Sequence, residues 1–417
     1  MGAARNESHV KTGSYPFGTR ARLPHAFAAG LGSNFVKPRA VYKNKTLKLG
    51  LRAMTKIAIV GTVGVPSNYG GFETLADNLI RQNAKRSDPD EITIYCSARA
   101  YAARKMSYFG ARLIYLPFEA NGAQSLLYDI ISIADAIRRK NDIILLLGHG
   151  GSFVIPLARL FSKARFITNI DGIEWQRKKW TALARCVLRL SEASAVRFSH
   201  EVISDNEAIR EYVHTAYAVE STVIAYGGDH AFRECSRNAP DFHDPKSYAL
   251  ALCRIEPENN VEMILKAFSR LNYKLIFVGN WNKSTFGKNL REKYAKYPNI
   301  SCIEPIYDGE ALMSIRAGAS VYVHGHSAGG TNPALVEMMH FGIPIFAHDN
   351  MFNRYTTENS AYFFKTFEDL CSIATNVDTI LARESGALLA RIARRRYTWD
   401  LIGHKYFSLF AKQGSGV

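Results

Sequence analysis

Four segments of this 417-residue chain combine residue types that could hold a phosphorylated ligand and act on it. Each follows a short apolar run of the kind that forms a buried strand. Ligands in open parallel sheets bind beyond the carboxyl ends of the strands. The segments are the glycine-rich loop 61–71, residues 169–180, residues 254–260 and residues 324–337.

The glycine-rich loop could bring backbone N–H groups close to a ligand. Gly70 and Gly71 directly precede a helical pattern that begins at Phe72, and the N-terminus of a helix attracts anions. The loop has neither the GxGxxG of a dinucleotide site nor the GK[ST] of a P-loop. A phosphate site and a tight strand-to-helix turn are therefore equally supported.

Residues 169–180 (NIDGIEWQRKKW) place two carboxylates and two tryptophans just after a strand. Carboxylates beside aromatic rings suit the recognition of sugar hydroxyls. We assign Asp171 and Glu174 to such a function. We interpret Trp175 and Trp180 as core residues at the start of a salt-bridged helix.

Arg254 follows the strand pattern that ends at Cys253. An arginine at a strand end can clamp a phosphate with two hydrogen bonds. A solvated surface arginine is the more common arrangement for such a residue on its own.

Residues 324–337 (HGHSAGGTNPALVE) predict a loop that leads into a helix. Asn332 can cap this helix, and Glu337 lies one turn further in, where it could accept hydrogen bonds from ribose hydroxyls. The loop is predicted to present free backbone amides to a diphosphate. These amides belong to Gly329, Gly330 and Thr331.

No metal site is predicted. His324 and His326 form a pair without an evident third ligand. Asp88 and Asp90 spell the DxD signature of metal-dependent sugar transfer, but they lie in a helix-to-strand turn, away from the strand ends.

Strand and helix patterns alternate twice along the chain, which predicts an α/β fold of two Rossmann-like, doubly wound domains facing a cleft. The expected divisions are an N-terminal domain over 54–230, a linker over 231–247, a C-terminal domain over 248–396 and a final helix and tail over 397–417. The six cysteines are far apart, which argues against disulfides and zinc modules and favours a reducing cytoplasm.

The net charge of +16 is unevenly distributed. Residues 1–53 carry ten basic groups and one acid, which leaves +7 for the remainder. This segment could contact a membrane or nucleic acid, could be a disordered leader, or could reflect a misassigned start, because Met54 precedes the first clear strand. We favour the last two explanations together.

From Lys56 to its C-terminus the chain resembles glycosyltransferase family 4 of GT-B type, and within it the bacterial rhamnosyltransferases of capsule and exopolysaccharide synthesis. The resemblance runs in order through nearly all of 56–412. It is carried by GTVGVPSNYGGFET (61–74), NIDGIEWQRKKW (169–180), ISDNEAIREYV (203–213), IAYGGD (224–229), CRIEPENN (253–260), FVGNW (277–281) and HGHSAGGTNPALVEMMHFGIPIFAHDN (324–350).

The resemblance implies a nucleotide-sugar donor held mainly by the C-terminal domain, retention at the anomeric carbon, no metal or cofactor, and a last helix that crosses back to the N-terminal domain. Glu337 matches the second acid of the family's E-x7-E pattern, while Gly329 stands where the first acid is usual. That loss of a polar partner suits a 6-deoxy sugar such as rhamnose. Asn259 replaces a lysine that the family pairs with Arg254, and His149 matches a histidine near the donor sugar.

The expected reaction transfers a deoxyhexose, L-rhamnose, from a dTDP- or UDP-linked donor. Arg254 and the loop amides would stabilise the departing diphosphate, His149 would position the sugar, and Asp171 and Glu174 would orient the acceptor. A donor such as UDP-glucose or UDP-galactose is an alternative. A non-enzymatic basic scaffold is another, but no aromatic residues interleave with Lys and Arg as nucleic-acid binding requires.

The acceptors of this family are usually lipid-linked, which predicts a cytoplasmic protein at the inner face of the membrane. Residues 177–200 have the pattern of a basic amphipathic helix. Contact with a membrane and ordinary packing in the core are equally supported for this helix.

Overall fold

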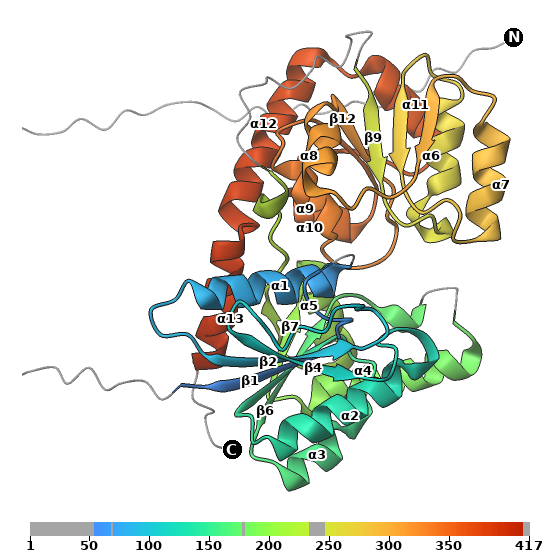
Figure 1. The fold of residues 1–417 in the computed structure, drawn as a ribbon. Coiled ribbons are helices and arrows are strands. Elements are labelled where there is room, and N and C mark those ends of the chain that lie inside the picture. Colours follow the sequence, from blue (N-terminus) through green and yellow to red (C-terminus); the bar gives the residue numbers. More distant parts are fainter. Residues whose placement is uncertain (1–53, 68–69, 177–179, 233–246, 412–417) are drawn as a thin grey trace, which may run out of the picture. The chain divides into compact units, whose positions relative to one another are not determined.

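The computed structural model describes residues 54–67, 70–176, 180–232 and 247–411. The predicted leader over 1–53 and most of the predicted linker lie outside these residues. For reference, residues 54–232 are called the N-terminal half and residues 247–411 the C-terminal half. Each half is built on its own sheet (Figure 1).

The N-terminal sheet has the strand order β3-β4-β2-β1-β5-β6-β7-β8. All its neighbouring strands run parallel except β3 and β4, which pair antiparallel. Its strands are β1 (Lys56–Val60), β2 (Glu91–Ser97), β3 (Ser107–Tyr108), β4 (Ala111–Leu116), β5 (Ile143–Leu147), β6 (Arg165–Ile170), β7 (Glu201–Ser204) and β8 (Thr222–Val223). Its helices are α1 (Gly71–Ala84), α2 (Ser125–Arg138), α3 (Ile155–Phe161), α4 (Ala182–Phe198) and α5 (Glu207–Tyr217).

The C-terminal sheet is parallel throughout, with the order β11-β10-β9-β12-β13-β14. Its strands are β9 (Ala249–Leu252), β10 (Leu275–Val278), β11 (Ile300–Ile303), β12 (Val321–His324), β13 (Ile345–His348) and β14 (Tyr362–Phe364). Its helices are α6 (Val261–Phe268), α7 (Thr285–Tyr294), α8 (Gly309–Ala317), α9 (Pro333–Met339), α10 (Met351–Thr357), α11 (Phe367–Asn376) and α12 (Thr379–Arg396).

Helices cover both faces of each sheet, so the strands are apolar on both sides. In β1, Ile57 and Ile59 belong to the same buried cluster as residues of α1, while Ala58 and Val60 belong to another with Tyr128 of α2. A strand buried on both faces reads as a continuous apolar run, and this is why the run IILLL of β5 is fully buried.

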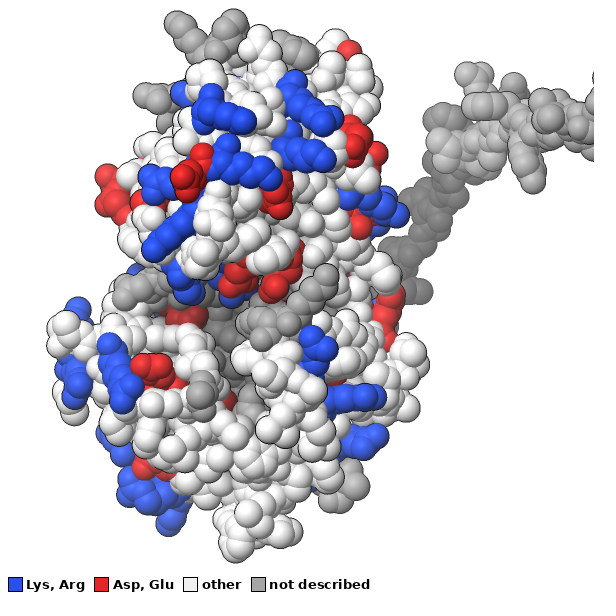
Figure 2. Space-filling model, turned by 90° about the vertical axis from the view of Figure 1, so that its right-hand side faces the viewer, with Lys and Arg blue, Asp and Glu red and all other residues white. Residues whose placement is uncertain are grey.

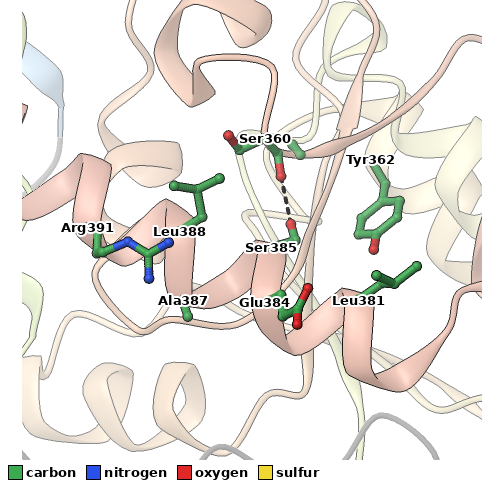
Figure 3. A pocket seen from close by; sticks show the side chains of 9 residues that line it. Ser360, Tyr362, Leu381, Glu384, Ser385, Ala387, Leu388 and Arg391 are labelled. Atoms are coloured by element: carbon green, nitrogen blue, oxygen red, sulfur yellow. Dashed lines mark hydrogen bonds between the residues drawn. The ribbon is translucent and has the colours of Figure 1, made fainter. Parts of the chain in front are cut away.

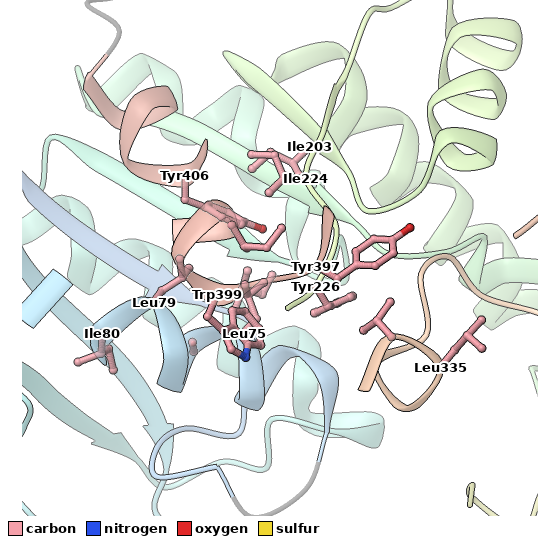
Figure 4. Close-up of a cluster of buried hydrophobic side chains, with 14 of the residues drawn as sticks. Leu75, Leu79, Ile80, Ile203, Ile224, Tyr226, Leu335, Tyr397, Trp399 and Tyr406 are labelled. Carbon is pink, nitrogen blue, oxygen red and sulfur yellow. The ribbon is translucent and has the colours of Figure 1, made fainter. Parts of the chain in front are cut away.

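The last helix, α13 (Trp399–Ala411), joins the two halves. It packs against α1, and the buried Tyr406 hydroxyl accepts a hydrogen bond of 2.7 Å from Asn169 Nδ2 at the end of β6. Trp399 and Tyr406 lie in one apolar cluster with Leu75 of α1 and Leu335 of α9 (Figure 4). The predicted return of the last helix to the N-terminal domain is confirmed.

The helix predicted over 177–200 corresponds to α4, and residues 177–179 lie outside the described residues. In the described residues α4 begins at Ala182, because Thr181 caps it by accepting a hydrogen bond of 3.3 Å from the Ala184 amide. No helix among the described residues is long and apolar enough to cross a membrane.

Candidate functional site

Three of the four predicted site segments, together with His149, lie at the switch points of the two sheets, while residues 169–180 follow β6. In each sheet the strand order reverses at one point, where the chain begins to add strands on the other side of the first strand. This point lies between β1 and β5 in the N-terminal sheet and between β9 and β12 in the C-terminal sheet. Loops that leave such strands in opposite directions open a crevice at their carboxyl ends. The glycine-rich loop and His149 follow β1 and β5, while Arg254 and the loop 325–331 follow β9 and β12.

Glu73 of α1 shapes the glycine-rich loop. Its Oε1 accepts hydrogen bonds from the Val63 amide at 2.8 Å and from the Thr62 hydroxyl at 3.2 Å. Burial is the main cause of the raised pKa of this carboxyl. Gly70 has a φ of 125°, and a Cβ there would collide with the Glu73 carboxylate. A Cβ on Gly71 would meet Pro333 of α9 at 3.3 Å. Both glycines are thus explained by packing, and their role in donor binding stays a prediction.

His149 is buried directly after β5. Its side chain is 4% exposed, and neither ring nitrogen has a hydrogen-bond partner among the described residues. Buried polar atoms are normally paired, so such a residue is a candidate for contact with a ligand. The following glycines, Gly150 and Gly151, pack against Asp129 of α2. Burial raises the pKa of the Asp129 carboxyl to about 7.

The acidic loop after β6 is held by its own tryptophans. Glu174 Oε1 accepts a hydrogen bond of 3.1 Å from Trp180 Nε1. The Trp175 indole donates to Glu192 Oε1 and to the Tyr212 hydroxyl, both at 3.3 Å. The prediction of two core tryptophans was wrong, because both rings are only half-buried and each is fixed through its polar edge.

Arg254 has a partly free side chain. It is 41% exposed, and its Nε lies 3.7 Å from Glu256 Oε2, which is a loose ion pair. The backbone below it is firmly fixed, because Asn259 Nδ2 donates a hydrogen bond of 2.7 Å to the Arg254 carbonyl. Asn259 therefore anchors the loop that carries the arginine.

The loop 325–331 is tied to the loop after β9. The Ser327 amide and hydroxyl donate to the Glu258 carbonyl at 3.0 and 2.7 Å. Asn332 caps α9 as predicted, accepting a hydrogen bond of 3.0 Å from the Ala334 amide. Gly329 has a φ of 113°, and a Cβ there would meet no atom within 4 Å.

Two of the loop amides that were expected to be free have protein partners. The Gly330 amide donates to the Asp171 carbonyl at 2.9 Å, and the Thr331 amide donates to Asp205 Oδ2 at 3.0 Å. Both acceptors belong to the N-terminal half. Asp171 therefore contacts this loop through its backbone, while the role of its carboxylate stays a prediction.

Glu337 is a buried carboxylate with two basic neighbours. Its Oε2 forms an ion pair with the Arg316 guanidinium of α8, and its Oε1 lies 3.4 Å from His230 Nε2. Arg316 is 6% exposed and Glu337 8%. A carboxylate has about four acceptor positions, so these contacts orient Glu337 and leave acceptor positions for a ligand. Its role in ribose binding stays a prediction.

The histidine pair after β12 is stacked, with ring centroids 4.3 Å apart. Burial holds the pKa of His324 well below its ordinary value, helped by the neighbouring His326 and His348. In the described part of the chain, no group of His, Cys, Asp and Glu is arranged to hold a metal ion. Metal independence itself stays a prediction. Asp90 of the DxD sequence is buried in its turn and forms an ion pair of 2.6 Å with Arg86.

The comparisons with known proteins match the two halves separately. Residues 54–229 match a domain of unknown function (DUF1972), and residues 232–399 match the family described as glycosyl transferases group 1. A search of curated protein sequences gave no match.

Several solved structures share the fold over most of the chain. Sucrose-phosphate synthase from Thermosynechococcus elongatus is 15% identical, covering 85% of this chain and 98% of its own, with a TM-score of 0.72. Anabaena HepE in complex with UDP and glucose is 14% identical, covering 86% and 100%, with a TM-score of 0.66. A glycosyltransferase from Rickettsia africae is 11% identical, covering 86% and 98%, with a TM-score of 0.61.

Together these findings support a GT-B glycosyltransferase. The glycosyltransferase assignment rests on the match over residues 232–399, because structures this distant in sequence show the fold alone. The predicted fold class of two Rossmann-like domains is confirmed.

Some residues of this candidate glycosyltransferase site were missed in the sequence. Asp205 directly follows β7, so the strand-end rule that selected Asp171 would also have selected it. Arg316 lies inside a helix and gives no comparable signal. The hollow lined by Ser360, Tyr362, Leu381 and Arg391 between β14 and α12 contains none of the predicted site residues (Figure 3).

Proposed function

We propose that the protein is a retaining, metal-independent glycosyltransferase that moves L-rhamnose from dTDP-rhamnose to a lipid-linked glycan acceptor in polysaccharide synthesis. It would act in the cytoplasm, at the inner face of the membrane. The observation that carries the proposal is the partly exposed Arg254 at the switch point of the C-terminal sheet, within the segment that matches the group 1 glycosyltransferases.

In this proposal each residue has a separate task. Negative charge develops on the diphosphate as its bond to the sugar breaks, and Arg254 stabilises it there. The unpaired ring nitrogens of His149 bind the sugar. Glu337, oriented by Arg316, binds the ribose. Asp171 and Glu174 orient the acceptor hydroxyl.

Gly329 supports a deoxy sugar as the transferred group. As a glycine it has no side chain that could bind a hydroxyl of the donor sugar, and its φ of 113° favours glycine at this position. A sugar without a hydroxyl at carbon 6 needs no polar side chain at position 329. Transfer from UDP-glucose or UDP-galactose is the second candidate, because an Anabaena HepE structure is a complex with UDP-glucose.

The basic-scaffold alternative gains no support. On the face drawn in Figure 2, Lys and Arg side chains are spread among Asp and Glu side chains and form no continuous band. A nucleic-acid partner would be expected to require such a band.

The donor is tested by incubating the protein with dTDP-rhamnose, UDP-glucose and UDP-galactose and measuring release of the nucleotide diphosphate. Mass spectrometry then identifies the product on lipid-linked acceptors. Arg254→Ala should lower turnover by about two to three orders of magnitude, the usual loss for one such charge-stabilising group. Arg291→Ala is the matched control. Arg291 lies on α7 and forms an ion pair with Glu304, which follows β11, so the variant removes a partly exposed arginine that is not a predicted site residue. Near-normal transfer by Arg254→Ala would contradict the proposal.

The proposed membrane contact is supported by an apolar patch on α3 and α4, which pack against each other. Its side chains are between 38% and 78% exposed: Leu157, Leu160, Phe161, Leu183, Val187 and Leu190. Exposed cations surround them, and no exposed acid occurs in residues 153–163 or 181–198. An apolar surface with a positive rim fits an anionic lipid surface.

Flotation with vesicles tests this contact. Binding to phosphatidylglycerol-containing vesicles should fall about tenfold or more in the double variant Leu160→Gln, Leu183→Gln, because two apolar side chains no longer enter the lipid. The double variant Ile380→Gln, Leu381→Gln on α12 changes side chains that are 67% and 59% exposed, compared with 78% and 77% for Leu160 and Leu183, and should bind as the wild type does. Equal binding by both double variants would rule out this patch as the membrane contact.

A further inference from the structure

Asp205 connects the two halves at the loop expected to bind the donor diphosphate. Its side chain is 1% exposed, although it stands at the carboxyl end of β7 in the N-terminal half. Its Oδ2 accepts a hydrogen bond of 3.0 Å from the Thr331 amide, and the Thr331 hydroxyl donates to its carbonyl at 2.5 Å. The neighbouring Asn206 donates from Nδ2 to the Thr331 hydroxyl at 3.2 Å.

The carboxylate occupies the space that an anion at this loop would need. A Cβ on Gly330 would collide with Asp205, so this side chain lies directly against the loop backbone. The Gly330 amide is also occupied, by the carbonyl of Asp171. A backbone N–H that donates to a protein carboxylate cannot at the same time make a full hydrogen bond to a phosphate oxygen.

The second carboxylate oxygen is left unpaired. Asp205 Oδ1 is buried without a hydrogen-bond partner among the described residues. A buried, half-satisfied carboxyl group costs free energy, and the single contact with the Thr331 amide offsets only part of the cost of burying it. Burial raises the pKa of the Asp205 carboxyl well above its ordinary value. The side chain therefore stands in for a phosphate oxygen by its position and as a hydrogen-bond acceptor.

We propose that Asp205 is an autoinhibitory clasp, whose carboxylate holds the Thr331 amide until the diphosphate of the donor displaces it. This inference rests on the proposed function, because it takes a nucleotide diphosphate as the ligand of the loop. The clasp keeps the loop closed against the N-terminal half in the absence of donor. Donor binding then requires the Asp205 contact to break, which lowers the apparent affinity for the donor.

The clasp is first tested without any ligand, by hydrogen exchange of the full-length protein. Peptides that cover 327–336 should exchange faster in Asp205→Ala than in the wild type, because the Thr331 amide loses its acceptor. Tyr355→Phe is the matched control. It removes a different hydrogen bond between the halves, of 2.6 Å from Tyr355 to Glu211, without touching the loop. Unchanged exchange in Asp205→Ala would overturn the clasp.

Competition is tested by calorimetric titration with UDP and with dTDP. Asp205→Ala should bind the nucleotide about threefold to tenfold more tightly than the wild type, which corresponds to the net loss of one competing hydrogen bond. Asp205→Asn keeps the shape and an accepting oxygen, so its affinity should lie between the two. Tyr355→Phe should bind as the wild type does.

The outcomes separate the clasp from the proposed function. Tighter binding by Asp205→Ala supports both. Weaker or unchanged binding in that variant, with clear binding by the wild type, overturns the clasp and leaves the donor assignment standing. If neither nucleotide binds any variant while exchange is faster in Asp205→Ala, the contact between the halves holds but the donor assignment and the competition both fail.

Discussion

Arg316 orients Glu337, the carboxylate that we propose binds the ribose. It forms a buried ion pair with Glu337, whose other oxygen lies 3.4 Å from His230. Removing one partner of a buried pair leaves an uncompensated charge, which is far more costly than the pair itself is favourable. Arg316 is therefore a positioning residue for Glu337.

Arg316→Met should lower the free energy of unfolding by about 3 kcal/mol and raise the KM for the donor more than it lowers kcat. Chemical denaturation and steady-state kinetics measure the two effects. Arg316→Lys keeps the charge and should recover most of the stability. An Arg316→Met variant as stable as the wild type would show that the ion pair does not hold Glu337.

Asp129 makes stability depend on pH. Burial raises the pKa of its carboxyl from the ordinary 3.8 to about 7 in the folded protein. Between these two values the folded chain binds more protons than the unfolded chain, so the contribution of Asp129 is most favourable below the lower value and is lost as pH rises to the upper one.

Asp129→Asn should remove this loss, since an amide does not ionise and its oxygen can still accept from the backbone. The variant should match the wild type near pH 4 and exceed it by a few kcal/mol near pH 8. Denaturation curves at both pH values measure the difference. Asp88→Asn, at an exposed turn position, is the control and should follow the wild type at both values.

Residue types near the site could be predicted where a strand end marks them. Arg254, His149, Asp171 and Glu337 all lie in loops or helices that follow strands, as expected. What the sequence could not reveal was partnership between distant positions. The Thr331 amide bonds a carboxylate 126 residues away, and no local pattern encodes that pairing. The prediction of two core tryptophans was wrong for a similar reason, because the hydrogen-bond partner of Trp175, Glu192, lies 17 residues further along the chain.

At the scale of elements, α13 is held to the first sheet by a buried polar contact. Asn169 Nδ2 donates to the Tyr406 hydroxyl, and Asn169 Oδ1 already lacks a partner among the described residues. Both side chains are at most 1% exposed. A further unsatisfied group at this position would be costly.

Tyr406→Phe should therefore lower the free energy of unfolding by about 1–3 kcal/mol, because it leaves the Asn169 amide without its acceptor. Thermal and chemical denaturation measure the change. Tyr307→Phe, at a side chain that is 68% exposed, should change stability little. A neutral Tyr406→Phe would mean that water replaces the hydroxyl.

Elements were predictable where periodicity was clear. The short apolar runs expected to form strands next to the four predicted site segments are β1, β6, β9 and β12. The helix α3 was missed because it is only seven residues long. Its exposed side also consists mostly of apolar residues, which hides the amphipathic pattern of a surface helix. The predicted start of α4 was too early because Trp180 and the cations before it extend the helical sequence pattern toward the N-terminus. In the structure the N-cap at Thr181 makes Ala182 the first residue of the helix.

At the scale of the whole molecule, one apolar cluster links both sheets. It contains Ile57 and Leu145 of the first sheet together with residues of α1 and α13, and it continues to Leu335 and Ile345 of the C-terminal half. Trp399 lies at the junction (Figure 4). Its Nε1 donates to His230 Nδ1 at 2.8 Å. Units that share a core unfold together when the shared contacts are worth more than the difference in their stabilities.

The wild type should therefore unfold in a single thermal transition, and Trp399→Ala should separate it into two. Truncating a buried tryptophan costs about 3–5 kcal/mol, and here that loss falls on the contacts that couple the halves. Trp281→Ala is the matched control, because Trp281 is equally buried but belongs to a cluster confined to the C-terminal half. Trp281→Ala should lower the stability of the C-terminal half but leave the contacts of Trp399 with both halves intact. Differential scanning calorimetry distinguishes the cases, and a single transition in Trp399→Ala would show that α13 is not the link on which cooperativity depends.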